Sequence, residues 1–218
     1  GLALAAMADD RLRLGLLRAM ALRELGRIPE SLAAFRAVAE TTAEGLGQCR
    51  AWIGVASCVR LLGGNEEGFA ALQAAEPLAR RFRAARELSE IHYYFGALRF
   101  ALGDIDGCLR HHADAHGFAL TAQDAECEAQ ALSGLGDAHY GRGRMRQAID
   151  HFRRCQALCR ERGFGRIEVG STHMIGAIRR YLSEGEQALA DLRQAAATAA
   201  KVGNIRTQMV ALNILGEI

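Results

Sequence analysis

Three residues with soft ligand atoms follow one another at helical spacing near the middle of the chain. Cys108, His112 and His116 stand four residues apart, and His111 lies beside them. Residues i, i+4 and i+8 share one face of a helix, so these side chains have the spacing of a transition-metal site. Cys108 and His112 also occupy two packing positions of the internal repeat described below. We therefore expect core packing at this ladder and no metal.

Other motifs that would indicate an enzyme are incomplete. Residues 134–136 (Gly-Leu-Gly) begin like a dinucleotide-binding loop, but His139 stands where the third glycine belongs and no strand precedes it. The chain contains no Walker phosphate loop and no nucleophile–base motif. Cys155 and Cys159 lie one helical turn apart, where a disulfide would be strained. The sequence predicts no enzymatic activity and no cofactor.

Composition and charge argue against several other classes of protein. The net charge of the 218 residues is +2 and the basic residues form no stripe, so nucleic-acid binding is not expected. No apolar run approaches the roughly 18 residues that a membrane span requires. The cysteines show no disulfide-framework spacing and fit a reducing compartment, so a cytoplasmic location is expected. They are Cys49, Cys58, Cys108, Cys127, Cys155 and Cys159.

Glycine recurs every 40 residues through most of the chain. The first series consists of Gly96, Gly136, Gly176 and Gly216. The second follows seven residues behind it and consists of Gly63, Gly103, Gly143 and Ser183. A fixed period of this length indicates one supersecondary unit that is copied and stacked. With helix-favouring composition and no alternating strand pattern, the chain is predicted to be an all-α solenoid.

One solenoid domain is expected over 1–218, with about five helical hairpins and one extra helix. Its repeats are predicted at 8–45, 46–84, 85–124, 125–165 and 166–204, with a partial repeat at 205–218. The expected helices are 8–25, 29–43, 46–62, 66–82, 85–101, 105–121, 125–141, 145–161, 166–182, 185–201 and 205–218.

Small residues return at fixed places in each hairpin, which allows the paired helices to approach closely. The second helix carries a small residue five positions after its turn residue: Ser31, Gly68, Cys108, Ala148 and Ala188. Four positions further on comes a larger residue expected to fill the adjoining hole: Phe35, Leu72, His112, Phe152 and Leu192. Glycine in the turn supplies a left-handed cap for the first helix.

This pattern resembles the tetratricopeptide repeat. The best match is Leu135-Gly136, then Gly143, Ala148, Phe152 and Cys155. The resemblance implies a right-handed α-α superhelix. The period of 40 exceeds the usual 34, as in a long-helix subtype found in large signalling proteins. HEAT-type repeats share this length, but the register of small residues favours the tetratricopeptide interpretation.

In the tetratricopeptide family the first helix of each hairpin lines the concave side. By position, the resemblance implies a partner-binding concave face formed by Arg50, Arg60, Tyr93, Tyr94, Phe100, Asp137, Tyr140, His173, Arg180 and Tyr181. Tyrosine and arginine dominate recognition hot spots, so a groove that grips a peptide or helix is expected. The alternative is that the tyrosines pack against the next repeat. The chaperone-type carboxylate clamp is not supported, because Ile53 and Ser57, or Tyr93 and Ala97, stand at its positions.

Residues 136–140, 151–155 and 163–168 also resemble repeat arms of large bacterial signalling proteins with ATPase or nucleotide-cyclase domains. The resemblance implies a non-enzymatic sensory arm that binds a protein or peptide partner, or neighbouring domains of a longer chain. The alternative is a small-ligand or signal-peptide receptor, with an enclosed pocket between the tyrosines and Arg180. The expected final helix has no partner helix and would expose Ile214 and Leu215. We therefore expect either a longer parent protein or self-association through this end.

Overall fold

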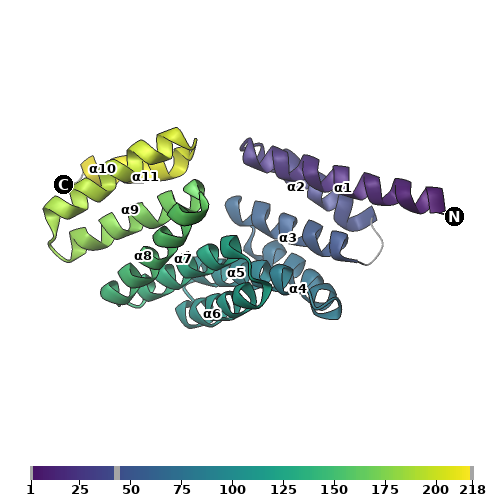
Figure 1. Ribbon diagram of the computed structural model, residues 1–218, viewed down its shortest axis with the longest axis horizontal. Helices are drawn as coiled ribbons and strands as arrows, with labels where there is room; N and C mark the ends of the chain where they lie inside the picture. Colours follow the sequence, from purple (N-terminus) through teal and green to yellow (C-terminus); the bar gives the residue numbers. More distant parts are fainter. Residues whose placement is uncertain (1, 42–44, 217–218) are drawn as a thin grey trace.

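The computed structural model describes residues 2–41 and 45–216, and within them the chain forms eleven helices and no strand (Figure 1). The predicted all-α class is confirmed. The helices are α1 (Leu2–Glu24), α2 (Ile28–Thr41), α3 (Leu46–Leu61), α4 (Asn65–Arg81), α5 (Ala85–Ala101), α6 (Ile105–Ala122), α7 (Ala125–Gly141), α8 (Met145–Arg162), α9 (Gly165–Tyr181), α10 (Gly185–Lys201) and α11 (Ile205–Gly216). None of these described helices is both long and apolar enough to cross a membrane.

The helix starts repeat with the period of the glycines. The first helices α5, α7, α9 and α11 begin 40 residues apart, as do the second helices α4, α6, α8 and α10. One boundary was predicted wrongly, because α1 begins at Leu2 and not at residue 8. Residues 2–8 contain only leucine, alanine and methionine, which are strong helix formers that extend the first helix. The predicted helix ends at 43 and 218 lie outside the described residues.

The turn positions adopt the left-handed conformation that the glycine series predicts. Gly103 has a φ of 76° and Gly143 a φ of 72°. Ser183, at the fourth place of the series, is forced into the same region with a φ of 62°, although it carries a Cβ. The second break in each repeat is also left-handed, as at Gly163 with a φ of 79°. The chain therefore reverses direction twice in each repeat by the same local device.

The predicted close packing is clearest around His112. This residue is 2% exposed, and its ring lies between α5 and α7, against Gly96 and Gly134. A Cβ added at Gly96 would come within 2.7 Å of the His112 ring. Phe152, the equivalent residue of the next repeat, is fully buried against Gly136 in the same way. Glycine on the first helix thus makes room for the large residue of the second helix.

The helices stack as a solenoid. Each helix packs against the next one in the chain, and the first helices of successive hairpins also pack on one another, as α3 does on α5 and α5 on α7. Figure 1 shows the stack bent into an arc, with α1 and α2 at one end and α10 and α11 at the other.

The exposed face of α11 differs from the expected one. Ile214 and Leu215, expected to be uncovered, are half-buried against a cluster that contains Leu192 and Ala195. The exposed apolar side chains of α11 are instead Ile205, Met209, Val210 and Leu212. Ala211 is fully buried in the same cluster, so the face of α11 that carries Ala211, Ile214 and Leu215 packs against α10.

Candidate functional site

A cavity of about 420 Å³ opens on the inner side of the arc between α1, α3, α5 and α7. We call it the inner cavity. Except for Phe35 of α2, all its lining residues belong to first helices of hairpins. They are Arg13, Leu16, Leu17, Met20, Arg23, Phe35, Arg50, Ile53, Gly54, Arg86, Glu87, Glu90, Tyr94, Glu126, Cys127 and Gln130. The first helices of the N-terminal half therefore share one concave surface.

The lining of the inner cavity combines four arginines and three glutamates with an apolar rim. Arg50 Nε donates a hydrogen bond to Glu87 Oε1 at 2.7 Å, and Glu87 is 5% exposed. Burial raises the pKa of Glu90, while the nearby Arg86 opposes that shift. On the α1 side, Leu17 and Met20 are exposed by 61% and 47%. The cavity thus offers charged groups beside accessible apolar surface.

Four predicted residues come together at the middle of the concave face, and we call them the central cluster: Arg60, Tyr93, Tyr94 and Asp137. The Arg60 guanidinium lies over the Tyr94 ring at 6.0 Å, and the Tyr93 and Tyr94 rings meet edge to face at 5.2 Å. Burial raises the pKa of Asp137 to about 7, and Arg60 partly opposes this. Burial also raises the pKa of Tyr93 to about 12. Tyr93 is half-buried against His112, so it serves packing as well as the concave surface.

The remaining predicted residues lie toward the C-terminal half. Tyr140 of α7 and Tyr181 of α9 form an edge-to-face pair with ring centroids 6.5 Å apart. Phe100, 36% exposed, lies at the end of α5 near Gly141 of α7. On α9, His173 is half-buried and Arg180 is exposed. The predicted set therefore falls into Arg50 in the inner cavity, the central cluster, whose Tyr94 also lines that cavity, and this outer group.

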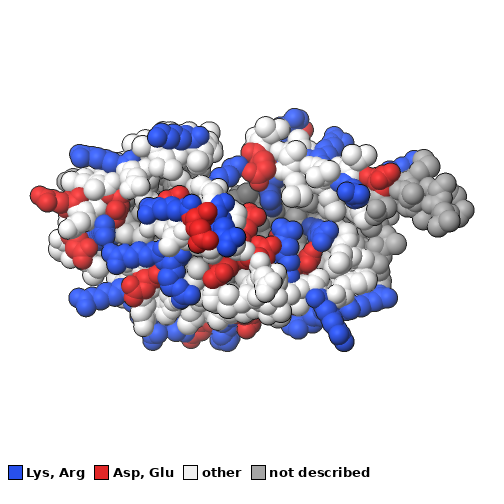
Figure 2. Space-filling view, viewed as in Figure 1, with Lys and Arg blue, Asp and Glu red and all other residues white. Residues whose placement is uncertain are grey.

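An ion pair connects the two arms of the arc across the concave side. Arg166, at the start of α9, binds Glu24, at the end of α1. Both side chains are 54% exposed, so solvent screens the pair strongly. Figure 2 shows a notch between the two raised ends, with basic and acidic side chains interspersed over this face. No single sign of charge dominates the view.

Sequence reasoning missed the contribution of α1. Arg13, Leu16, Leu17 and Met20 form one wall of the inner cavity, although none was assigned to the concave face. Their spacing of three and four residues places them on one helical face, a signal already present in the sequence. The predicted concave face begins at Arg50 of the second hairpin and therefore leaves out α1.

The Cys108–His112–His116 ladder lies along a packing face. Cys108 and His112 are buried, and burial raises the pKa of the Cys108 thiol to about 12 and lowers that of His112 to about 3. His116 Nε2 lies 3.8 Å from Glu128 on α7. All six cysteines are buried and unbridged, and Cys155 and Cys159 have their sulfur atoms 3.9 Å apart.

No family model matches the sequence, and no curated protein matches it either. Several solved structures share its fold. A Signal Transduction ATPase with Numerous Domains protein with a tetratricopeptide repeat sensor, from Pyrococcus horikoshii, matches with a TM-score of 0.72 and 14% identity, over 93% of this chain and 32% of its own. A Rap protein complexed with Competence and Sporulation Factor matches with a TM-score of 0.83 and 14% identity, over 94% of this chain and 62% of its own. Aspartyl phosphate phosphatase F from Bacillus subtilis matches with a TM-score of 0.73 and 13% identity, over 94% of this chain and 55% of its own.

These likenesses establish the fold. The chain has a helical solenoid fold like that of tetratricopeptide-repeat proteins, as its sequence pattern indicates. It spans about a third of the length of the first of these proteins and less than two thirds of the other two.

Proposed function

We propose that this solenoid is a protein-interaction module that holds a segment of a partner protein in the inner cavity and along the central cluster. The observation that carries the proposal is the cavity itself, where charged and apolar side chains converge from four successive first helices. Stacked repeats present such extended concave surfaces for binding. Known structures with this fold include a Rap protein complexed with Competence and Sporulation Factor, which supports the proposal.

The lining indicates what kind of segment fits. Leu17 and Met20 offer exposed apolar surface to an aliphatic or aromatic anchor residue. Arg13, exposed at the same rim, would pair with a carboxylate of the partner. Arg50 is already engaged by the buried Glu87, so it serves the shape of the wall more than recognition. We therefore infer a segment that carries an apolar anchor close to an acidic residue.

A regulatory setting is part of this proposal. One structural neighbour is a signal-transduction ATPase in which the repeats are described as a sensor. We propose that the present solenoid is likewise a non-catalytic sensory arm of a bacterial signalling protein, and that domains of the same protein are among its partners. Self-association through α11, expected from the sequence, stays a prediction.

A second candidate function is a receptor for a small ligand or a short signal peptide. The volume of about 420 Å³ favours it, because pockets of roughly 300–1,000 Å³ are typical of small-molecule sites. The two functions differ in how many helices the bound molecule would contact. A small ligand would protect amides of α1, α3, α5 and the start of α7 from hydrogen exchange, whereas an extended segment would also protect the end of α7 beside Tyr140 and the end of α9 beside Tyr181.

The proposal is tested by selecting peptides from a random display library on the immobilised wild-type protein and measuring their affinity by fluorescence polarisation. Met20→Glu and Arg13→Glu should each weaken the selected peptides by about 10-fold or more, since both change the rim of the cavity. Leu120→Glu and Arg110→Glu on α6 are matched controls at exposed positions, and they should leave affinity unchanged. Peptides that bind both rim variants with wild-type affinity, or failure to select any peptide, would contradict the proposed groove.

A further inference from the structure

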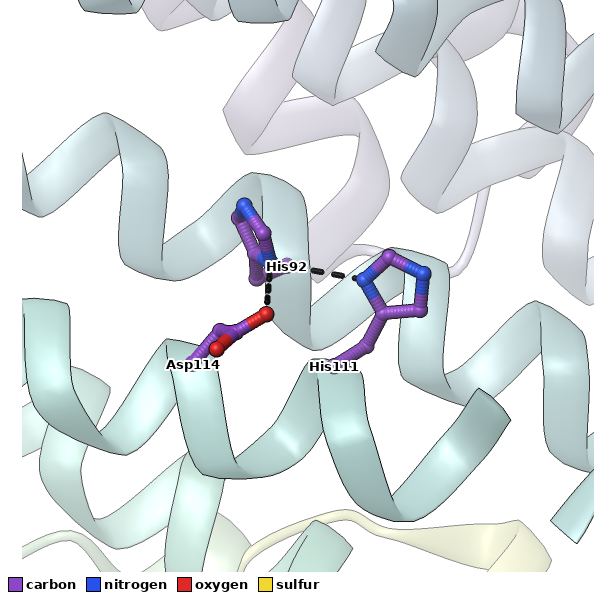
Figure 3. Close-up of side chains that lie close together, drawn as sticks. All are labelled: His92, His111 and Asp114. Atoms are coloured by element: carbon purple, nitrogen blue, oxygen red, sulfur yellow. Dashed lines mark hydrogen bonds and ion pairs between the residues drawn. The ribbon is translucent and has the colours of Figure 1, made fainter. Parts of the chain in front are cut away.

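A second group of side chains converges between α5 and α6, away from the inner cavity. His92 of α5 meets His111 and Asp114 of α6, and Figure 3 shows the three side chains directed toward one another. His92 Nδ1 lies 3.3 Å from His111 Nδ1 and 3.3 Å from Asp114 Oδ2. One ligand atom from each of the three lies within 4.8 Å of the others, and no other such group occurs among the described residues.

The two separations from His92 Nδ1 are those of ligands around one metal ion. Two nitrogen ligands at 2.0–2.1 Å from a tetrahedral zinc ion stand about 3.3–3.4 Å apart. Both contacts of His92 Nδ1 match this edge length. Hydrogen bonding alone accounts for the trio poorly, because a ring nitrogen carries either one hydrogen or one lone pair. His92 Nδ1 cannot fully serve His111 and Asp114 at the same time.

The protonation states suit a metal as well. Burial lowers the pKa of His92 and of His111, although Asp114 works against the shift in both. The lowered pKa values favour the neutral imidazole, which is the form that coordinates metals. Asp114 remains accessible, with 57% of its side chain exposed, and gives an ion a path from solvent.

The far side of His92 carries a further feature of metal sites. Its Nε2 is buried without a hydrogen-bond partner, and Glu76 Oε1 of α4 lies 3.8 Å away. Arg80 holds that same carboxylate oxygen, with its Nε at 2.9 Å and its Nη2 at 2.6 Å. Metal-binding histidines usually donate their second N–H to a carboxylate that fixes the ring. Glu76 stands where such a supporting carboxylate is needed and requires a shift of under about 1 Å to reach hydrogen-bond distance.

We propose that His92, His111 and Asp114 form a binding site for a first-row divalent transition metal ion, with Zn²⁺ as the best fit and water at the fourth position. Two imidazoles and one carboxylate are ligands that zinc accepts. A bound ion would join α5 to α6 at the centre of the arc, and Glu76 would extend the connection to α4. The site is independent of the proposed peptide groove and would stiffen the hairpin that carries Tyr93 and Tyr94.

The test is calorimetric titration of Zn²⁺ into the chelator-stripped 218-residue chain, with thermal unfolding recorded in parallel. The wild type should bind one equivalent and gain thermal stability on binding. His111→Asn and Asp114→Asn should abolish this binding, and Glu76→Gln should weaken it by about 10–100-fold as the supporting carboxylate. Asp114→Asn changes an exposed residue, so it keeps the test valid even where a buried substitution impairs folding.

Controls separate this site from adventitious binding. His139 and His151 form a stacked pair 5.1 Å apart on α7 and α8 and belong to no described three-ligand group, so His151→Gln should retain full Zn²⁺ binding. Titration with Co²⁺ should give no thiolate-to-metal charge-transfer absorption, because no cysteine is a proposed ligand. Absence of one-equivalent binding in the wild type, unchanged binding in Asp114→Asn, or a thiolate band would each overturn the proposal.

Discussion

At the scale of single residues, Asp137 on the concave face has a strongly raised pKa. Its carboxyl interacts with Arg60 of α3 and Tyr93 of α5. Its negative charge also acts to raise the pKa of Cys108 on α6 and of Cys155 on α8. Burial dominates these influences and raises the pKa of Asp137 from 3.8 to about 7. A carboxyl that is half protonated near neutral pH can change charge when a partner covers or pairs it.

Asp137 should make the stability of the fold depend on pH. The folded carboxyl holds its proton more tightly than the unfolded one, so its contribution to stability falls as the pH rises from about 4 to about 7. Asp137→Asn removes this dependence. The difference in free energy of unfolding, variant minus wild type, should therefore increase over that range and level off above it. Urea unfolding at several pH values measures this difference, and a constant value between pH 4 and pH 8 would contradict the raised pKa.

The role of a residue could be predicted from the sequence only where its position in the repeat determines that role. The packing role of His112 follows from its register, since every repeat places a large side chain there. The meeting of His92 with His111 and Asp114 could not be predicted, because it depends on how α5 and α6 are rotated about their own axes. Helical spacing within one segment shows which residues share a face, but not which face of a neighbouring helix they meet.

At the scale of elements, the starts of equivalent helices differ in how well they are capped. Asp104 accepts a hydrogen bond from the Gly107 backbone N–H at 2.8 Å, which caps α6. At the equivalent start of α8 stands Arg144, which makes no such side-chain cap. A side-chain cap satisfies one of the free N–H groups of the first turn, and a negative charge there is favourable. The starts of α6 and α8 therefore compare a capped and an uncapped helix at the same position of the repeat.

Exchanging these caps should shift stability in opposite directions. Arg144→Asp should raise the free energy of unfolding by about 0.5–1 kcal/mol, and Asp104→Ala should lower it by about 0.5–2 kcal/mol. Arg144 is exposed and Asp104 is half-buried in its turn. Asp104→Ala also removes the ion pair with Arg99, which adds to its loss of stability. Chemical denaturation followed by circular dichroism measures both values. A loss of stability in Arg144→Asp would show that the arginine has a structural role that its position does not reveal.

At the scale of the whole molecule, stability is distributed along a line. Within the described residues, the helices pack only on near neighbours in the chain. The period of 40 made this architecture predictable from the sequence. The curvature was not predictable, since it follows from small rotations between hairpins. The exposed Arg166–Glu24 pair joins the two arms but, like other solvated pairs, contributes at most about 1 kcal/mol. The arc must therefore be held mainly by the packing of each hairpin on the next.

Because each helix packs on its near neighbours, a destabilising substitution in one hairpin should affect mainly the helices beside it. Leu72 and Leu192 occupy the same repeat position, on α4 and α10, and both are fully buried. Replacing either with alanine should cost about 2–5 kcal/mol locally, because each leaves a cavity between paired helices. In Leu192→Ala, amide hydrogen exchange should accelerate over α9–α11 and stay near the wild-type rate over α3–α5, whereas Leu72→Ala should show the reverse. Nearest-neighbour coupling of repeats produces this contrast. Equal loss of protection at both ends in both variants would mean that the chain unfolds as one cooperative unit, and that its ends communicate far more strongly than their contacts allow.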